Sequence, residues 1–285
     1  MYKIVSKRKL NDTMTWLVIE APLVARKARP GQFIILRTDE YGERIPLTMA
    51  GHDSEKGTID IIYAAVGRTT MLLDQFEEGD ALADVVGPLG KPTHMEGLKR
   101  VAVVGGGTGN ALAYPLATGM HKEGIKVDMI AGFKNKDMVI LEDEFRAGVD
   151  NLYMMTDDGS YGEKGFTTDK LKELIESGKE YDEIVAVGPP MMMKFTCKMA
   201  QDYGIHSIAS LTAYMIDGTG MCGGCRLTLN TEEGPKMKFA CVDGPDFNGY
   251  EVDFDEAISR GRMYFDYERH AHEETCNLFK MAENA

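Results

Sequence analysis

Short apolar segments separated by glycine, proline and aspartate fill the first hundred residues. Segments 31–37 (GQFIILR) and 59–63 (IDIIY) are rich in β-branched and aromatic residues, which is typical of strands. Several such strands at close spacing indicate a small antiparallel barrel or sandwich. We therefore predict a β domain over residues 1–98.

The pattern changes near Leu98. Residues 99–104 (KRVAVV) predict a strand, a glycine-rich turn follows at once, and a helical pattern extends from about Asn110 to His121. Strands that alternate with helices predict βαβ units and a parallel sheet, and we assign this α/β domain to residues 99–208. Its further expected elements are strands at 126–132, 152–156 and 183–187 and a helix at 168–177.

Two smaller parts follow the α/β domain. Glycines surround a group of cysteines after about residue 207, and a β-like segment at 236–240 leads to the last cysteine of that group. We predict a small module over residues 209–254. The tail, residues 255–285, is charged and has a helical pattern.

Composition and charge exclude several classes of protein. The 285 residues suffice for two or three domains, and a hydrophobic content of 44% suffices for their cores. The net charge of −13 argues against a nucleic-acid partner, which needs a positive field. The first residues lack the apolar core of a signal peptide, and no apolar run approaches the roughly 18 residues that span a bilayer. We expect a cytoplasmic protein without membrane insertion.

The cysteines give the sharpest chemical signal. Cys222, Cys225 and Cys241 cluster, and an odd total of five in a reducing compartment argues against a disulfide framework. The spacing Asp217-x4-Cys222-x2-Cys225-x15-Cys241 is that of a plant-type [2Fe–2S] ferredoxin with aspartate in place of the first cysteine. A carboxylate can ligate iron, so one oxygen and three sulfurs would complete the site. A structural zinc site and uncoordinated thiols remain as alternatives.

A second signal is the glycine-rich turn between the predicted strand and helix. Glycines in this position let a pyrophosphate approach the backbone at a helix N-terminus. The run lacks the last glycine of G-x-G-x-x-G, where Asn110 stands, so an ordinary βα turn is the alternative. Two later turns follow predicted strands and would meet it at the same edge of the sheet. The residues concerned are Gly105, Gly106, Gly107, Thr108 and Gly109, then Asp157, then Gly188, Pro189 and Pro190.

The β domain carries weaker signals for a flavin. Arg44 could clamp a phosphate through paired hydrogen bonds, and the hydroxyl of Thr48 could meet the edge of a flavin ring. Gly67, Thr69 and Thr70 lie where a helix could begin, which suits a pyrophosphate. An arginine on a strand is more often simply solvated. We assign no catalytic residue, because the histidines stand apart from any nucleophile and the methionine run 191–193 suits core packing.

These motifs occur in an order that resembles the ferredoxin–NADP reductase superfamily along essentially the whole chain. Within it, the sequence is similar to the electron-transfer subunits of dihydroorotate dehydrogenase. It is still more similar to the small subunits of NADH-dependent reduced ferredoxin:NADP oxidoreductases. The segment 215–225 (MIDGTGMCGGC) with 241–245 (CVDGP) carries the resemblance. Asp217 points to the second type, since the dihydroorotate-type subunits usually have cysteine there.

The resemblance implies an FAD-binding barrel, an NAD(H)-binding parallel-sheet domain and a C-terminal [2Fe–2S] module. NAD(H) would lie beside Gly105–Gly109, Asp157 and Gly188–Pro190; the one departure noted is Leu112, where many relatives have proline. Asp217 and the three clustered cysteines would ligate the cluster. FAD would contact Arg44, Pro46, Leu47, Thr48 and Tyr63, with its phosphates at Gly67, Thr69 and Thr70.

The expected function follows from this set of cofactors. Nicotinamide exchanges a two-electron hydride, a [2Fe–2S] cluster carries one electron, and a flavin converts between the two. A lone cluster also implies a larger partner subunit with further flavin and iron–sulfur centres, through which ferredoxin would act. Two alternatives are electron delivery to dihydroorotate dehydrogenase and, in a different class, a zinc-stabilised binding protein without redox activity.

Overall fold

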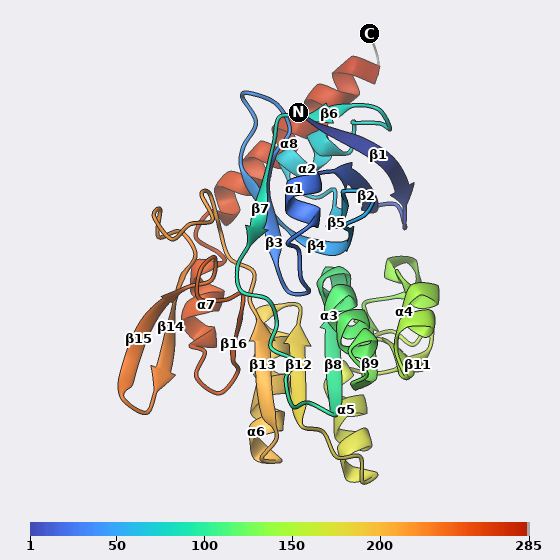
Figure 1. Ribbon diagram of the computed structural model, residues 1–285, viewed down its shortest axis with the longest axis vertical. Helices are drawn as coiled ribbons and strands as arrows, with labels where there is room; N and C mark the ends of the chain where they lie inside the picture. The colour runs from blue at the N-terminus through green and yellow to red at the C-terminus, as the bar shows by residue number, and fades with distance from the viewer. Residues whose placement is uncertain (284–285) are drawn as a thin grey trace.

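The molecule consists of a barrel, an α/β unit and a smaller cysteine-bearing part at the side of both (Figure 1). The structure is a computed structural model and describes residues 1–283. The barrel lies above the parallel sheet in this view, and the long C-terminal helix returns to the barrel. No helix among the described residues is long and apolar enough to cross a membrane.

The N-terminal domain is the predicted antiparallel barrel. Its sheet has the strand order β6-β1-β2-β5-β4-β3-β7, and every pairing between neighbours is antiparallel. Alternate residues such as Leu17 and Ile19 point inward and are fully buried, as a sheet with one apolar face requires. The strands are β1 (Tyr2–Lys9), β2 (Met14–Glu20), β3 (Phe33–Arg37), β4 (Ile45–Asp53), β5 (Thr58–Ala64), β6 (Ala81–Leu82) and β7 (Asp84–Leu89), with helices α1 (Pro22–Ala25) and α2 (Arg68–Leu73).

The second domain is the predicted parallel sheet, with the order β11-β10-β9-β8-β12-β13-β16. Its central strands are mostly apolar because helices cover both faces; Val101–Val104 of β8 are completely buried, and Asp128 of β9 and Glu183 of β12 are buried exceptions. The strands are β8 (Arg100–Gly106), β9 (Lys126–Phe133), β10 (Asn151–Thr156), β11 (Glu163–Lys164), β12 (Glu183–Val187) and β13 (His206–Ser210). The helices are η1 (Gly107–Gly109), α3 (Asn110–Lys122), η2 (Lys136–Met138), α4 (Glu142–Gly148), α5 (Thr167–Glu176) and α6 (Pro190–Asp202).

The order of this sheet creates a switch point between β8 and β12. The chain moves from β8 through β9 to β10 on one side and then crosses to β12 and β13 on the other. Loops at the carboxyl ends of β8 and β12 therefore diverge in opposite directions. Open α/β sheets bind their ligands in the crevice at such a point.

The third part does not form a sheet of its own beyond a hairpin of β14 (Arg226–Thr231) and β15 (Gly234–Phe239). The next strand, β16 (Asp246–Asn248), pairs antiparallel with β13 and becomes the edge of the α/β sheet. The expected boundary between residues 208 and 209 falls inside β13. The α/β domain and the cysteine-bearing part therefore share one sheet, because β16 of the latter pairs with β13 of the former.

The expected helical tail consists of α7 (Phe254–Arg260) and α8 (Phe265–Glu283). Helix α8 lies beside α2, so the last helix returns to the first domain (Figure 1).

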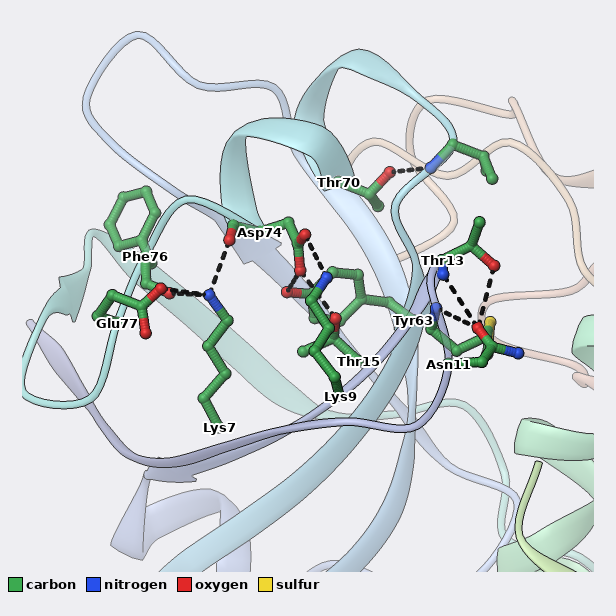
Figure 2. Close-up of polar contacts among 12 residues, drawn as sticks. Lys7, Lys9, Asn11, Thr13, Thr15, Tyr63, Thr70, Asp74, Phe76 and Glu77 are labelled. Atoms are coloured by element: carbon green, nitrogen blue, oxygen red, sulfur yellow. Dashed lines mark hydrogen bonds and ion pairs between the residues drawn. The ribbon is translucent and has the colours of Figure 1, made fainter. Parts of the chain in front are cut away.

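The C-terminal end of α2 is fixed by a polar network in the barrel (Figure 2). Asp74 caps this helix and accepts hydrogen bonds from the hydroxyls of Thr15 at 2.8 Å and Tyr63 at 3.3 Å, and from the Lys9 ammonium at 2.5 Å. Lys7 donates to the Asp74 carbonyl at 2.8 Å. Burial alone would raise the pKa of Asp74, but the hydrogen bonds from Lys9 and Thr15 outweigh it and hold this pKa below its ordinary value.

Asp74→Ala should lower the free energy of unfolding by about 2–4 kcal/mol, because it leaves two buried hydroxyls without a partner. The half-exposed Lys9 contributes little to this figure. A carboxyl with a lowered folded pKa stabilises above its unfolded pKa and loses this effect on acidification. The difference between variant and wild type in urea unfolding should therefore shrink below about pH 4.

The exposed Asp12, in the turn between β1 and β2, provides the control. Asp12→Ala should change stability by less than about 0.5 kcal/mol. Equal effects of the two substitutions would contradict a structural role for the network.

Candidate functional site

A narrow pocket lies where the barrel, α3 and the segment after β13 meet. The predicted residues Pro46 and Thr48 line it from β4. Leu47, between them in the strand, packs on the other face against the barrel core. The other lining residues are Gly31, Phe33, Leu112, Leu116, Ser210, Leu211, Thr212, Ala213, Met215 and Pro245.

Arg44 lies just before β4 and reaches across to the third part of the molecule. Its Nε donates to the Ile216 carbonyl at 2.9 Å, next to the predicted ligand Asp217. The neighbouring Glu43 accepts a 2.7 Å hydrogen bond from the hydroxyl of Thr69 in α2. The loop before β4 therefore joins the cysteine loop on one side to α2 on the other.

The residues predicted to meet phosphates lie at the start of α2. Gly67 is the N-cap of this helix. The hydroxyl of Thr70 accepts from the Gly67 amide at 3.0 Å and donates to the Gly67 carbonyl at 3.0 Å, which closes the first turn. Tyr63, in contrast, lies in the barrel interior with 2% of its surface exposed and bonds to Asp74. Burial raises the pKa of Tyr63. The structure does not bring the Tyr63 side chain together with the other predicted flavin residues.

The glycine turns after β8 and β12 are in direct contact. A Cβ atom at Gly109 would lie 2.6 Å from both the Gly188 Cα and the Val187 carbonyl oxygen. A Cβ at Gly188 would lie 3.0 Å from the Gly106 carbonyl oxygen. Only glycine permits two backbones to approach this closely. The predicted turns therefore meet at the switch point of the sheet. Gly107 and Thr108 belong to the short helix η1, which leads from β8 into α3.

Asn110 is a structural residue of this turn that the sequence motif did not identify. Its Nδ2 donates to the carbonyls of Gly107 and Gly132, both at 3.0 Å, and ties the turn to the end of β9. The Asn110 side chain is fully buried, and its Oδ1 has no partner among the described residues. The departure from G-x-G-x-x-G thus has a function in packing.

Asp157 lies at the same edge but farther along it. It follows β10, which is separated from β8 by β9, and its amide donates to the Phe133 carbonyl at 3.1 Å. Its side chain is exposed. Pro189 and Pro190 begin α6 next to β12, with Pro189 as the N-cap. The edge therefore presents an acidic group at one end and an apolar helix start at the other.

The predicted cysteine loop is held by backbone amides. Asp217 accepts hydrogen bonds from the amides of Thr219 and Cys222, each at 2.9 Å, and these amides lower its pKa. The Cys225 sulfur accepts from the Cys241 amide at 3.4 Å. Positive φ angles at Gly218, Gly220 and Gly223 let the chain wrap around this point. Arg260 of α7 supports the loop by donating to the Gly224 carbonyl at 3.0 Å.

The electrostatics of the loop fit a cationic centre with thiolate ligands. Cys225 and Cys241 are 1% and 2% exposed, whereas Cys222 is exposed. Burial, then the neighbouring Cys225 and Asp217, raise the pKa of Cys241 to about 12. Such neighbours repel one another as anions and require a positive charge between them. Among the described residues, no group of three or more histidine, cysteine or acidic side chains is arranged to hold a metal ion.

A wider cleft of about 1020 Å³ lies between the barrel and the other side of α3. Trp16 and Asp60 of the barrel and Tyr114 of α3 line it, and burial raises the pKa of Asp60. None of the residues predicted from the sequence lines this cleft.

Two family models match the chain. Residues 103–198 match the oxidoreductase NAD-binding domain, and residues 212–253 match the iron-sulfur cluster binding domain of dihydroorotate dehydrogenase B. The first match spans the glycine turns and the second spans Asp217 and all three clustered cysteines.

Similar proteins cover nearly the whole chain. An uncharacterised protein encoded in the adh 3′ region of Clostridium beijerinckii is 50% identical over 93% of this chain and 90% of its own. A homologue of the dihydroorotate dehydrogenase B (NAD⁺) electron-transfer subunit from Thermotoga maritima is 42% identical, covering 95% and 94%. A solved structure of NADH-dependent reduced ferredoxin-NADP oxidoreductase, described in the context of flavin-based electron bifurcation, superposes with a TM-score of 0.88. It is 42% identical and covers 96% of this chain and 97% of that one.

Gly109→Ala should destabilise the protein by about 1–3 kcal/mol, because the added methyl group meets backbone atoms that cannot move aside. Thermal or urea unfolding measures this change. Gly261→Ala is the matched control, because Gly261 has a helical conformation and its added Cβ would lie 3.4 Å from the Ala257 carbonyl oxygen, an ordinary contact distance. A Gly109→Ala protein as stable as wild type would contradict the close packing of the two turns.

Proposed function

The chain belongs to the family of dihydroorotate dehydrogenase B electron-transfer subunits and their homologues, and from this we propose its specific role. It moves electrons between NAD(H), FAD and a [2Fe–2S] cluster as the small subunit of an NADH-dependent reduced ferredoxin:NADP oxidoreductase. One observation carries the proposal: the segment after β13 lines the pocket beside Pro46 and Thr48 as far as Met215, and Asp217 follows two residues later. A single short segment thus joins the narrow pocket, where the edge of a flavin ring would lie, to the cysteine loop.

The residues of the chain serve this role by binding and orientation. Bound FAD would supply the conversion between two-electron hydride chemistry and one-electron transfer to the cluster. Pro46, Thr48 and the segment after β13 would contact its ring, while Arg44 and the start of α2 would meet its phosphates. The bond to the Ile216 carbonyl uses only Nε of Arg44, so the N–H groups of the two Nη atoms could donate to a phosphate while that bond is kept.

NAD(H) would bind at the switch point between β8 and β12. The bare backbone at Gly107, where an added Cβ would meet nothing within 4 Å, leaves room for a pyrophosphate before the N-terminus of α3. Asp157, exposed at the same edge, is the candidate acceptor for a ribose hydroxyl. A carboxylate there would disfavour the additional phosphate of NADP.

The cluster would be held by Asp217, Cys222, Cys225 and Cys241. The amides that bond to Asp217 and to the cysteine sulfurs would stabilise the negative charge of the ligated cluster. Thiolates of this kind persist in a reducing compartment, so we place the protein in the cytoplasm.

Electron delivery to a dihydroorotate dehydrogenase is the second candidate function. The family model that covers the cysteine loop and many of the relatives carry that name. Asp217 in the position of the first ligand favours the ferredoxin:NADP type. Assays of the complex with orotate and with ferredoxin distinguish the two.

The cluster assignment is tested by anaerobic purification with analysis of flavin, iron and sulfide. The wild-type chain should contain flavin and about two irons. Asp217→Ala should lose most of the iron and sulfide but retain the flavin, whereas Asp217→Cys should keep both. Glu232→Ala, in the turn of the β14–β15 hairpin, is the control and should match wild type. Full iron content in Asp217→Ala would rule out this residue as a ligand.

A larger partner subunit would exchange electrons with the cluster, and ferredoxin would act through that subunit. Large apolar side chains are exposed in and beside the cysteine loop: Ile216, Met221, Tyr264 and Tyr267. The ring of Tyr264 packs edge-to-face on Tyr214 at 5.3 Å, which places the start of α8 beside the loop. Exposed apolar groups gathered in this way are typical of interaction surfaces.

Met221→Glu should weaken binding of the larger subunit by about tenfold or more, because Met221 is 87% exposed within the loop. Gel filtration or calorimetry of the mixed subunits measures this. Leu23→Glu, equally apolar and exposed but on α1 of the barrel, should bind like wild type. Unchanged binding of Met221→Glu would place the interface elsewhere.

A further inference from the structure

The linker between the first two domains crosses the segment that returns from the cysteine loop. The Lys91 amide donates to the Gly244 carbonyl at 2.7 Å. Two residues farther on, the Thr93 hydroxyl donates to Oδ2 of Asp246 at 2.5 Å. The linker and the return segment are therefore joined at two successive points.

The same stretch of linker is bonded to the barrel. The Thr93 amide donates to the Pro30 carbonyl at 3.0 Å, and the Gln32 side chain donates to the Gly90 carbonyl at 2.9 Å. A Cβ at Gly31 would lie 2.1 Å from the Thr93 hydroxyl oxygen, so the linker lies directly on the barrel backbone there. Thr93 thus contacts the barrel through its amide and the return segment through its hydroxyl.

The return segment is also the base of the cysteine loop. The Leu211 amide donates to the Pro245 carbonyl at 3.0 Å, and Ser210 pairs with Asp246 in the register of β13 and β16. These contacts close the excursion that begins at Leu211 and contains all four candidate cluster ligands. Ser210, Leu211 and Pro245 also line the narrow pocket. The base of the loop and the wall of the pocket are the same residues.

Asp246 is well suited to a fixed structural position. Its Oδ1 is buried and has no hydrogen-bond partner among the described residues. Burial raises the pKa of Asp246, although the hydroxyls of Ser210 and Thr93 act in the opposite direction. A group buried in this way does not exchange its partners for water without a large cost. Its bond to Thr93 is therefore a stable connection between the domains.

We propose that Thr93 and Asp246 are positioning residues that fix the cysteine loop relative to the flavin pocket. The inference rests on the proposed function, because it concerns the distance between the two redox sites. The pocket wall after β13 leads into the loop, and the Thr93–Asp246 contact fixes the base of that loop to the barrel that supplies Pro46 and Thr48. Loss of the contact frees the loop to shift against the barrel while each site keeps its own residues.

The test compares Thr93→Val, which removes the hydroxyl at nearly constant volume, with Thr93→Ser, which retains it. Thr231→Val is the matched control, because the Thr231 hydroxyl donates within its own hairpin to the Gly234 carbonyl at 2.8 Å. In Thr93→Val, amide hydrogen exchange at Lys91 and Leu211 should accelerate roughly fivefold to tenfold, as expected for loss of one hydrogen bond. Flavin and iron content should stay at wild-type levels.

Two further measurements separate positioning from general loosening. Reduction of the cluster after mixing with NADH should slow severalfold in Thr93→Val, while reduction of the flavin in the same experiment should not. The paramagnetic resonance spectrum of the reduced cluster should broaden in the same variant. Thr93→Ser should restore all three properties, and Thr231→Val should leave them unchanged.

Distinct results would overturn the inference and the function. Wild-type exchange and wild-type cluster reduction in Thr93→Val, with both cofactors bound, would refute the positioning role. Failure of Thr93→Ser to restore these properties would refute it as well. A wild-type chain that binds neither flavin nor iron after anaerobic reconstitution would instead refute the proposed function.

Discussion

The arrangement of the molecule depends on the hydrogen bond that closes the cysteine loop at its base, from the Leu211 amide to the Pro245 carbonyl. Residues on one side of this bond line the pocket beside Thr48, and residues on the other side lead back from Cys241. The loop can therefore carry its ligands on flexible glycine turns and still have a defined origin. The two ends of this loop line the narrow pocket, so the loop that carries the cysteines begins and ends beside the pocket proposed for the flavin.

The carboxylates of the chain illustrate how local partners set different roles for one chemical group. Asp74 is surrounded by donors and a lysine, and its pKa is lowered although burial opposes this. Asp217 is held at the surface by backbone amides, which orient it and lower its pKa, as the ligand role proposed for it requires. Asp246 has only hydroxyl donors and one oxygen without a partner, so burial dominates and raises its pKa. The first suits stability, the second ligation and the third a rigid connection.

Features encoded by neighbouring residues could be predicted from the sequence. The strands of the parallel sheet and helix α3 follow from apolar runs and the glycine turn, and the spacing from Asp217 to Cys241 is local as well. Contacts between distant segments could not be predicted in this way. The inward position of Tyr63 depends on the twist of the barrel, and the packing of Gly109 on Gly188 depends on the order of the strands. Nothing in the linker sequence around Thr93 indicates that Asp246, far along the chain, accepts its hydroxyl.

The addition of β16 to the sheet affects the order in which the chain can fold during synthesis. Until residues 246–248 emerge, β13 has an unpaired side with free backbone donors and acceptors. Such an edge invites pairing with other chains. The nucleotide-binding domain is thus completed only after the cysteine loop has been made, and a nascent chain interrupted within that loop exposes an aggregation-prone strand. Maturation of the metal site and protection of the sheet are thereby coupled in time.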